Sequence, residues 1–189
     1  KKAEISKHLD VVGLDYHIGS QITEVSPFIA ALEKSLELIS QLKAEGIKIL
    51  HIDIGGGVGI AYNEEKTINI EQYVRSVLDK VGDLEVILEP GRAIVGNAGI
   101  FVTQVEYLKQ GGVKSFAIID GAMNDLLRPS LYGSYHKAIA VEDNSKGIKD
   151  IWDLVGPICE TADFLAKDRE LTLEQGDYIA LMSTGAYGF

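Results

Sequence analysis

The sequence predicts an α/β domain over residues 1–96 and an all-β domain over residues 97–189. In the first part, apolar strands alternate with amphipathic helices, which is the pattern of parallel strands joined by right-handed crossovers. In the second part the helical periodicity ends, and short strands follow one another between turn residues, as in an antiparallel Greek-key barrel or sandwich. The change of pattern at residues 96–97 marks the expected boundary.

Three strands and two helices are expected in the first part. The strands cover residues 9–16, 47–54 and 85–89. Ser26 as N-cap, with Pro27 at the first helical position, begins one helix, and Gly46 ends it in a left-handed conformation. Asn69 with Gln72 forms a variant of the capping box at the start of the other helix.

The third strand, Val86-Ile87-Leu88, is an unbroken apolar run, which predicts burial on both faces of a sheet. A barrel and an open doubly wound sheet both have such strands, and both bind ligands at the carboxyl ends of the strands. His17, the triple glycine at residues 55–57 and Glu89 all follow strand ends. We therefore expect them at one edge of the sheet.

The second part has an alternating strand at its start. In residues 101–108, we expect one side of the strand to carry Phe101, Thr103, Val105 and Tyr107. Further strands are expected over residues 115–120, 137–141, 152–155 and 178–182.

Composition argues against several classes of function. The chain has 189 residues and a net charge of −10, an acidity that argues against a nucleic-acid or anionic-membrane surface. No apolar run of about 18 residues predicts a membrane span, and no signal peptide is expected. Cys159 is the only cysteine, which excludes an internal disulfide framework and favours a reducing, cytoplasmic compartment.

The candidate ligand-binding loops have structural as well as functional interpretations. Glycines 55–57 after a parallel strand let backbone N–H groups converge on a phosphate, although three glycines alone more often mark a tight turn. Their spacing is neither that of a dinucleotide fold nor that of a P-loop. Ser20 could reach the same phosphate, and His17 could stack on a flat ring or be a structural histidine. Tyr187 either contacts phosphate or substrate or packs in the core.

The charged candidates also have two interpretations. Glu89 either pairs with a nearby cation or stands at the open end of its strand. Arg128 suits bidentate capture of a carboxylate, and the alternative is an exposed ion pair of little energetic value. Cys159 is either a small buried apolar residue or, because Glu160 and Asp163 favour the protonated thiol, a proton donor.

Six motifs together resemble the diaminopimelate branch of the pyridoxal-phosphate-dependent, alanine-racemase-like decarboxylases. They are His17-Ile18-Gly19-Ser20-Gln21, Gly55-Gly56-Gly57, Glu89-Pro90-Gly91-Arg92, Met123-Asn124-Asp125-Leu126-Leu127-Arg128-Pro129, Cys159-Glu160 and Gly185-Ala186-Tyr187. The second and third motifs are shared with ornithine and arginine decarboxylases. Thr161 and Ala162 depart from the usual Ser-Gly after Cys-Glu, and we expect little effect because both are small. The resemblance implies the C-terminal part of a TIM-like (β/α)8 barrel followed by a Greek-key β-domain.

Pyridoxal phosphate is the cofactor that this resemblance implies, and no metal is expected. Glu89 would keep the ring nitrogen protonated, so that the ring acts as an electron sink, and His17 would stack on the ring. The phosphate would lie on Ser20, Gly56, Gly57, the turn Pro90-Gly91-Arg92 and Tyr187.

The implied reaction converts meso-2,6-diaminopimelate to L-lysine and CO2, the last step of lysine biosynthesis. The carboxylate of the substrate's non-reacting end would be held by Arg92, Arg128, Tyr132 and Tyr187. Glu160 would pair with the ammonium group at that end, and Cys159 would return a proton as general acid. In the family the Cys-Glu pair comes from the neighbouring subunit, which implies a homodimer with shared active sites.

The family also requires a lysine that forms a Schiff base with the cofactor, in a Tyr-Ala-x-Lys-Ala-like setting. None of the lysines here has that setting, so we expect this chain to lack roughly the first half of the enzyme and to be inactive alone. The alternatives are a related ornithine- or arginine-type decarboxylase and a non-catalytic homologue that binds a partner. Arg128 and Glu160 argue against the first alternative, and the joint presence of the site residues argues against the second.

Overall fold

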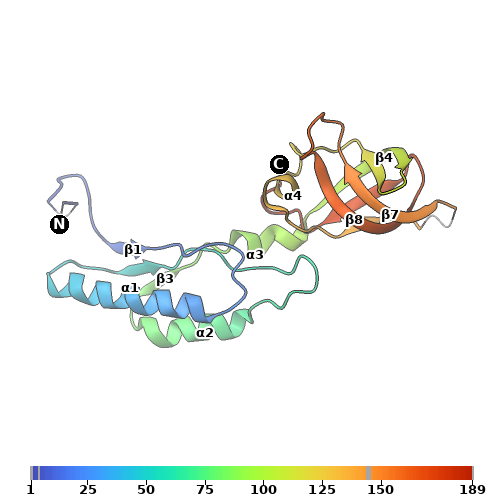
Figure 1. The fold of residues 1–189 in the computed structure, drawn as a ribbon. Coiled ribbons are helices and arrows are strands. Elements are labelled where there is room, and N and C mark those ends of the chain that lie inside the picture. Colours follow the sequence, from blue (N-terminus) through green and yellow to red (C-terminus); the bar gives the residue numbers. More distant parts are fainter. Residues whose placement is uncertain (1, 4, 144–145, 189) are drawn as a thin grey trace. The chain divides into compact units, whose positions relative to one another are not determined.

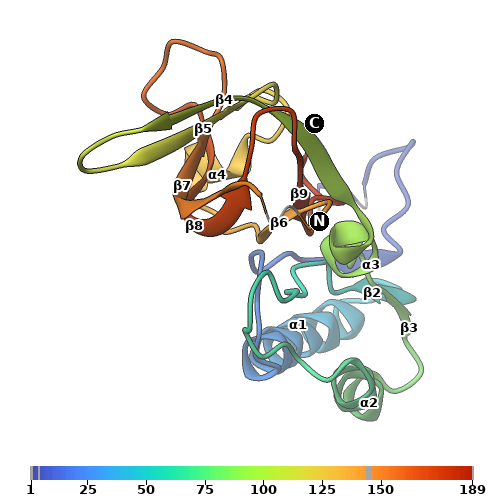
Figure 2. The ribbon, with the colours of Figure 1, turned by 90° about the vertical axis from the view of Figure 1, so that its right-hand side faces the viewer.

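The computed structural model describes residues 2–3, 5–143 and 146–188, which form two compact units (Figures 1 and 2). The first unit contains the residues up to Ile60 together with Lys66–Ala93. The second contains Ala61–Glu65 together with the residues from Ile94 on. The structure thus divides the chain just after Ala93, and the boundary at residues 96–97 stays a prediction.

A parallel sheet with two covering helices forms the first unit. Its elements are β1 (Gly13–Asp15), α1 (Ser26–Ala44), β2 (His51–Asp53), α2 (Ile70–Val81), β3 (Glu85–Ile87) and α3 (Gly91–Val95), which runs across the division. The strands are parallel in the order β1-β2-β3, and both long helices lie on the same face of the sheet (Figure 2). The α/β pattern is confirmed here, and the described strands do not close a barrel.

The core of the first unit lies between this sheet and its helices. Its buried side chains include Phe28, Leu32, Ile39, Ile52, Ile54, Tyr73, Val77 and Val81. Because side chains alternate along a strand, the neighbours of Ile52, His51 and Asp53, face away from the helices. The face without helices carries several polar side chains, since Asp53 lies in register with Asp15 and His51 with Glu85, and it also carries Ile87.

Two local predictions for the first unit are wrong. Val25 already has helical backbone angles and is the N-cap of α1, so Ser26 lies inside the helix and caps nothing. Ile87 is 38% exposed because the helices cover only the other face of the sheet and β3 is an edge strand. The cap of α2 is confirmed, since the backbone N–H of Gln72 donates to Asn69 Oδ1 at 2.9 Å.

The second unit is a mixed β-sheet. Its elements are η1 (Gly96–Ala98), β4 (Ile100–Gln110), β5 (Ser115–Ile119), α4 (Arg128–Tyr132), β6 (Ala138–Ala140), β7 (Ile148–Val155), β8 (Phe164–Leu173) and β9 (Tyr178–Met182). The strand order is β6-β9-β4-β5-β7-β8, and contact between β6 and β8 leaves the sheet nearly closed. A fully antiparallel sheet was the expectation, which is wrong for β5 and β7 because these strands pair in parallel. The Greek-key order is not confirmed.

A bulge and an unpredicted strand account for the other differences in this unit. The register of β4 against β5 shifts between Val105 and Tyr107, and one extra residue moves the following side chains to the opposite face. Tyr107 is consequently 65% exposed, whereas Thr103 and Val105 are buried, so the prediction that Tyr107 shares their side of the strand is wrong. β8 was not predicted because charged residues fill its middle, where Asp168 adopts a φ of 56°.

Candidate active site

Loops that follow the three parallel strands lie side by side in the first unit. Their backbone hydrogen bonds extend the sheet beyond the strands, because Tyr16 N donates to Asp53 O at 3.2 Å and Glu89 N donates to Gly55 O at 2.9 Å. A Cβ built on Gly55 would lie 3.1 Å from Nδ1 of His17. The structure thus brings His17, the triple glycine and Glu89 to one edge of the sheet.

Backbone packing explains why this loop contains glycines. A Cβ at Gly56 would lie 2.3 Å from the carbonyl oxygen of Glu89, and a Cβ at Gly57 would lie 2.3 Å from that of Gly19. Gly57 also has a φ of 96°, which favours glycine. The adjoining loops therefore require these glycines, whatever ligand the edge binds.

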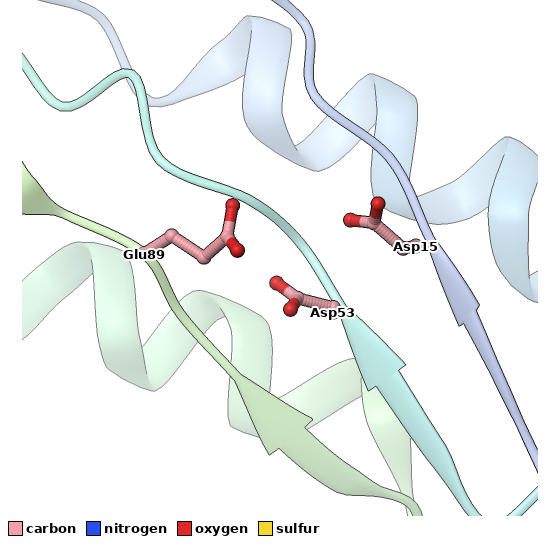
Figure 3. Close-up of side chains that lie close together, drawn as sticks. All are labelled: Asp15, Asp53 and Glu89. Atoms are coloured by element: carbon pink, nitrogen blue, oxygen red, sulfur yellow. The ribbon is translucent and has the colours of Figure 1, made fainter.

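Carboxylates gather at the same edge. Asp15, Asp53 and Glu89 each place an oxygen within 4.8 Å of the others (Figure 3). Among the residues that the structure describes, none of the three forms an ion pair, and Glu89 is exposed where its strand ends. Asp53 also accepts a hydrogen bond from Gly55 N at 2.9 Å, which fixes the start of the glycine turn. Three neighbouring negative charges favour a cationic group beside them.

Ser20 and Arg92 join the first loop to the third. Nη2 of Arg92, a residue only 7% exposed, donates to Ser20 Oγ at 3.0 Å. Gly91 precedes Arg92 in the turn, and a Cβ built on Gly91 would meet no atom within 4 Å. The space beside this turn is open, with a hydroxyl and a guanidinium nearby that can donate to an anion.

Burial also shifts the pKa of a nearby phenol. Tyr16 precedes His17, and burial raises the pKa of Tyr16 to about 12. The pKa of Tyr73, in the core beneath, is also raised to about 12, first by burial and then by the proximity of Tyr16. Both phenols therefore stay protonated even at pH values at which an exposed tyrosine ionises.

The second unit presents a guanidinium among three tyrosines. Cζ of Arg128 lies 5.6 Å from the ring centroid of Tyr62, 6.0 Å from that of Tyr132 and 5.7 Å from that of Tyr187. Tyr132 lies one helical turn after Arg128 in α4, which explains their proximity. Arg128 Nη2 donates to Ser134 Oγ at 3.0 Å.

Arg128 has no acidic partner within the described part of the chain. Its side chain is half-buried, and its Nε is buried without a hydrogen-bond partner there. An uncompensated, partly buried cation is costly, so this position suits an anionic ligand. The exposed ion pair considered from the sequence is wrong for Arg128.

The Cys159 loop is held by a buried carboxylate. Asp163 is 3% exposed, and its oxygens accept from the backbone N–H groups of Met123 and Ile158, each at 2.7 Å. Cys159 itself is exposed, so its interpretation as a buried apolar residue is wrong. Glu160 is also exposed, next to it.

This loop is linked to the helix that carries Arg128. Ser130 Oγ donates to the carbonyl oxygen of Ala162, so α4 and the loop share one hydrogen-bonded scaffold. Tyr187, with a φ of 56°, is 61% exposed, which contradicts its interpretation as a core residue.

Sequence reasoning missed three residues that organise these sites. Asp53 had a usable signal, because an acid directly before a glycine turn commonly accepts from the turn's backbone. Asp163 was considered only for its effect on the thiol, and its hydrogen bond to Met123 spans 40 residues. Tyr62 had no local signal, because its neighbour Arg128 lies far along the chain.

Comparisons with known proteins identify the family of this chain. Residues 10–185 match the family of pyridoxal-dependent decarboxylases over its C-terminal sheet domain. The chain belongs to this family. The resemblance identified from the motifs is thereby confirmed.

Two similar curated proteins are diaminopimelate decarboxylases. The diaminopimelate decarboxylase of Vibrio cholerae is 52% identical over 185 residues, which are 96% of this chain and 44% of that protein. That of Pseudomonas aeruginosa is 50% identical over 184 residues, again 96% of this chain and 44% of that protein. The chain therefore spans less than half the length of these relatives.

Solved structures show the same fold. Diaminopimelate decarboxylase from Helicobacter pylori, complexed with L-lysine, matches with a TM-score of 0.92 and 40% identity, covering 99% of this chain and 47% of that one. A lysine/ornithine decarboxylase from Vibrio vulnificus, complexed with cadaverine, matches with a TM-score of 0.84, covering 95% of this chain and 50% of that one. Its identity is 22%, so this second likeness concerns the fold alone.

None of the described helices combines the length and the apolar character that a membrane crossing requires.

Proposed function

We propose that the intact protein containing this chain uses pyridoxal phosphate to decarboxylate meso-2,6-diaminopimelate to L-lysine and CO2. Family membership and the names of relatives at about 50% identity support the reaction class. The observation that carries the substrate assignment is Arg128, a half-buried guanidinium among tyrosines with no acid partner among the described residues. A substrate with a carboxylate at its non-reacting end supplies that partner.

The strand-end loops of the first unit fit the cofactor. When bound, pyridoxal phosphate supplies an electron sink for the carbanion that remains after CO2 is lost. The exposed Glu89 carboxylate would accept a hydrogen bond from the protonated ring nitrogen, and Asp15 and Asp53 add negative charge that keeps this proton in place. His17 would lie against the ring. The three carboxylates thus gain the cationic neighbour that they lack within the described chain.

The phosphate of the cofactor would be held by the open turn at residues 90–92 and its neighbours. Backbone N–H groups of Gly56 and Gly57, the Ser20 hydroxyl and the Arg92 guanidinium are donors of the required kind. The N–H of Gly91 donates to the carbonyl oxygen of Glu89 at 2.8 Å, so Pro90 and Gly91 would shape the turn beside the phosphate. The Tyr187 hydroxyl would complete this set. Arg92 also would contribute to binding the substrate carboxylate.

Substrate contacts would come from the second unit. Arg128 and Tyr132 would bind the carboxylate of the non-reacting end, and Glu160 would pair with the ammonium group beside it. The exposed Cys159 thiol would donate a proton to the carbon that loses CO2. The proposal includes a homodimer in which Cys159 and Glu160 complete the partner's active site, and a cytoplasmic location.

Substrate preference tests the proposal. The intact protein is assayed with diaminopimelate, ornithine, arginine and lysine, and diaminopimelate is expected to be turned over best. Arg128→Leu is expected to raise KM for diaminopimelate by roughly 100-fold, since a charge-assisted bidentate contact is lost. Arg75→Leu, an exposed arginine of α2 paired with Glu71, is the matched control and leaves KM unchanged.

A preference for ornithine would reject the proposal, because the diamine formed from ornithine has no distal carboxylate to bind Arg128. Equal KM values for the Arg128 and Arg75 variants would reject the role of Arg128 alone.

A further inference from the structure

Tyr62 differs from the other two tyrosines beside Arg128. Its side chain is 8% exposed, whereas Tyr132 is 72% and Tyr187 is 61% exposed. A ring that is excluded from water offers a cation a stronger and more fixed contact than an exposed ring. Of the three rings beside Arg128, Tyr62 is therefore the one whose position the fold determines.

Packing behind Tyr62 restrains its ring. The ring contacts His136 edge-on, with centroids 5.2 Å apart and an interplanar angle of 83°. His136 is fully buried, and its Nδ1 donates to the carbonyl oxygen of Met182 at 2.9 Å. Since Met182 ends β9, the position of Tyr62 is tied to the central sheet of the second unit.

The backbone of Tyr62 is restrained as well. Tyr62 N donates to Glu65 Oε2 at 2.9 Å, and Asn63 N donates to the same oxygen at 2.8 Å. This closed turn and the buried ring together fix one wall beside the guanidinium of Arg128. A guanidinium binds a carboxylate through two parallel N–H donors only when its plane is held in the correct orientation.

We propose that Tyr62 is a positioning residue that orients Arg128 for the carboxylate at the substrate's non-reacting end. The inference rests on the proposed function and adds a residue that acts through Arg128 without touching the reacting atoms. It follows that loss of the ring weakens ligands that carry this carboxylate and spares ligands that lack it.

The test uses the intact protein with Tyr62→Leu and Tyr62→Phe. Tyr62→Leu is expected to raise KM for diaminopimelate about 10-fold while kcat changes less than about threefold, because a positioning contact contributes to binding. Tyr62→Phe keeps the ring and is expected to restore KM to within about twofold of the wild-type value. Tyr107→Leu, at an exposed tyrosine of β4, is the matched control.

Binding of the product L-lysine and of its analogue cadaverine supplies a readout that does not depend on turnover. L-lysine keeps the carboxylate and cadaverine lacks it, so Tyr62→Leu is expected to weaken the equilibrium binding of L-lysine about 10-fold and leave cadaverine unchanged. In an Arg128→Leu background the same substitution is expected to add no further loss. Should Tyr62→Leu fail to fold, Tyr62→Met, which keeps side-chain volume without a ring, is expected to show the same selectivity.

Equal weakening of L-lysine and cadaverine, or a full additional loss in the Arg128→Leu background, would overturn the role of Tyr62. Wild-type protein that does not decarboxylate diaminopimelate would overturn the proposed function itself. If the wild type decarboxylates diaminopimelate but Tyr62→Leu has the same KM and the same L-lysine affinity as Tyr107→Leu, only the role of Tyr62 is overturned.

Discussion

The two units position their functional groups in different ways. In the first unit, backbone contacts between parallel-strand loops set the geometry, as the close approach of Gly56 to the Glu89 carbonyl shows. In the second unit, side chains set it, through the buried Asp163 carboxylate and the buried Tyr62 ring. Substitutions should therefore act differently in the two units: added atoms damage the first, and lost hydrogen bonds damage the second.

The largest effect is expected for Gly56→Ala. Its Cβ would lie 2.3 Å from a backbone oxygen that cannot rotate away, so the Glu89 loop must move. We expect activity of the intact protein to fall by at least about 100-fold, and the free energy of unfolding by roughly 1–3 kcal/mol. Gly112→Ala, where the added Cβ meets no atom within 4 Å, is the control for kinetics and denaturant unfolding. Wild-type activity in Gly56→Ala would show that the loops are not held by backbone contact.

A large kinetic effect with little change in stability is expected for Cys159→Ala. The thiol is exposed, so its removal leaves no cavity, and the free energy of unfolding should change by less than about 1 kcal/mol. The loss of a general acid is expected to lower kcat about 100-fold and leave KM within about threefold. Steady-state kinetics measures kcat and KM of this variant. Thr161→Ala, at the exposed residue two positions further along the chain, is the control. An unchanged kcat would remove the proton-donor assignment.

An intermediate effect on stability is expected for Asp163→Asn. The amide can accept with only one oxygen, so one of the two backbone N–H groups that bond to this buried side chain loses its partner. Such a loss costs about 1–3 kcal/mol of unfolding free energy. Asp79→Asn, at an exposed position of α2, is the control in thermal unfolding. Equal melting temperatures for the two variants would contradict the view that this carboxylate holds the loop.

The smallest effect is expected for Asp120→Asn, and it depends on pH. The Thr103 hydroxyl and the Gln104 backbone N–H donate to Asp120 and lower its pKa. Because the pKa is lower in the folded state, the charged carboxylate stabilises the protein above its ordinary pKa. This stabilisation is lost as the pH falls through the lowered value. The variant should be less stable by up to about 1 kcal/mol at neutral pH, with a smaller difference near pH 3. Denaturant titrations at several pH values measure the difference in unfolding free energy between the wild type and the variant. A difference that grows as the pH falls would contradict the prediction.

Elements with strong local signals were predictable. The α/β pattern, the helix cap at Asn69 and the edge of the sheet that carries His17 and Glu89 all follow from spacing and residue type. Residues whose role depends on partners distant in sequence were not predictable. Asp163 and Tyr62 belong to this group, since their contacts join segments 40 or more residues apart.

The sequence by itself determined the alternation of strands and long helices in the first unit, the family, and which residues are chemically able to serve a decarboxylase. Only the tertiary structure decided that β5 and β7 pair in parallel, that Tyr107 turns outward at a bulge, and that Arg128 lies among tyrosines without an acid in the described chain. The physical reason is range: periodicity and capping depend on residues a few positions apart, whereas strand pairing, bulges and buried side-chain contacts depend on segments that meet only when the chain folds.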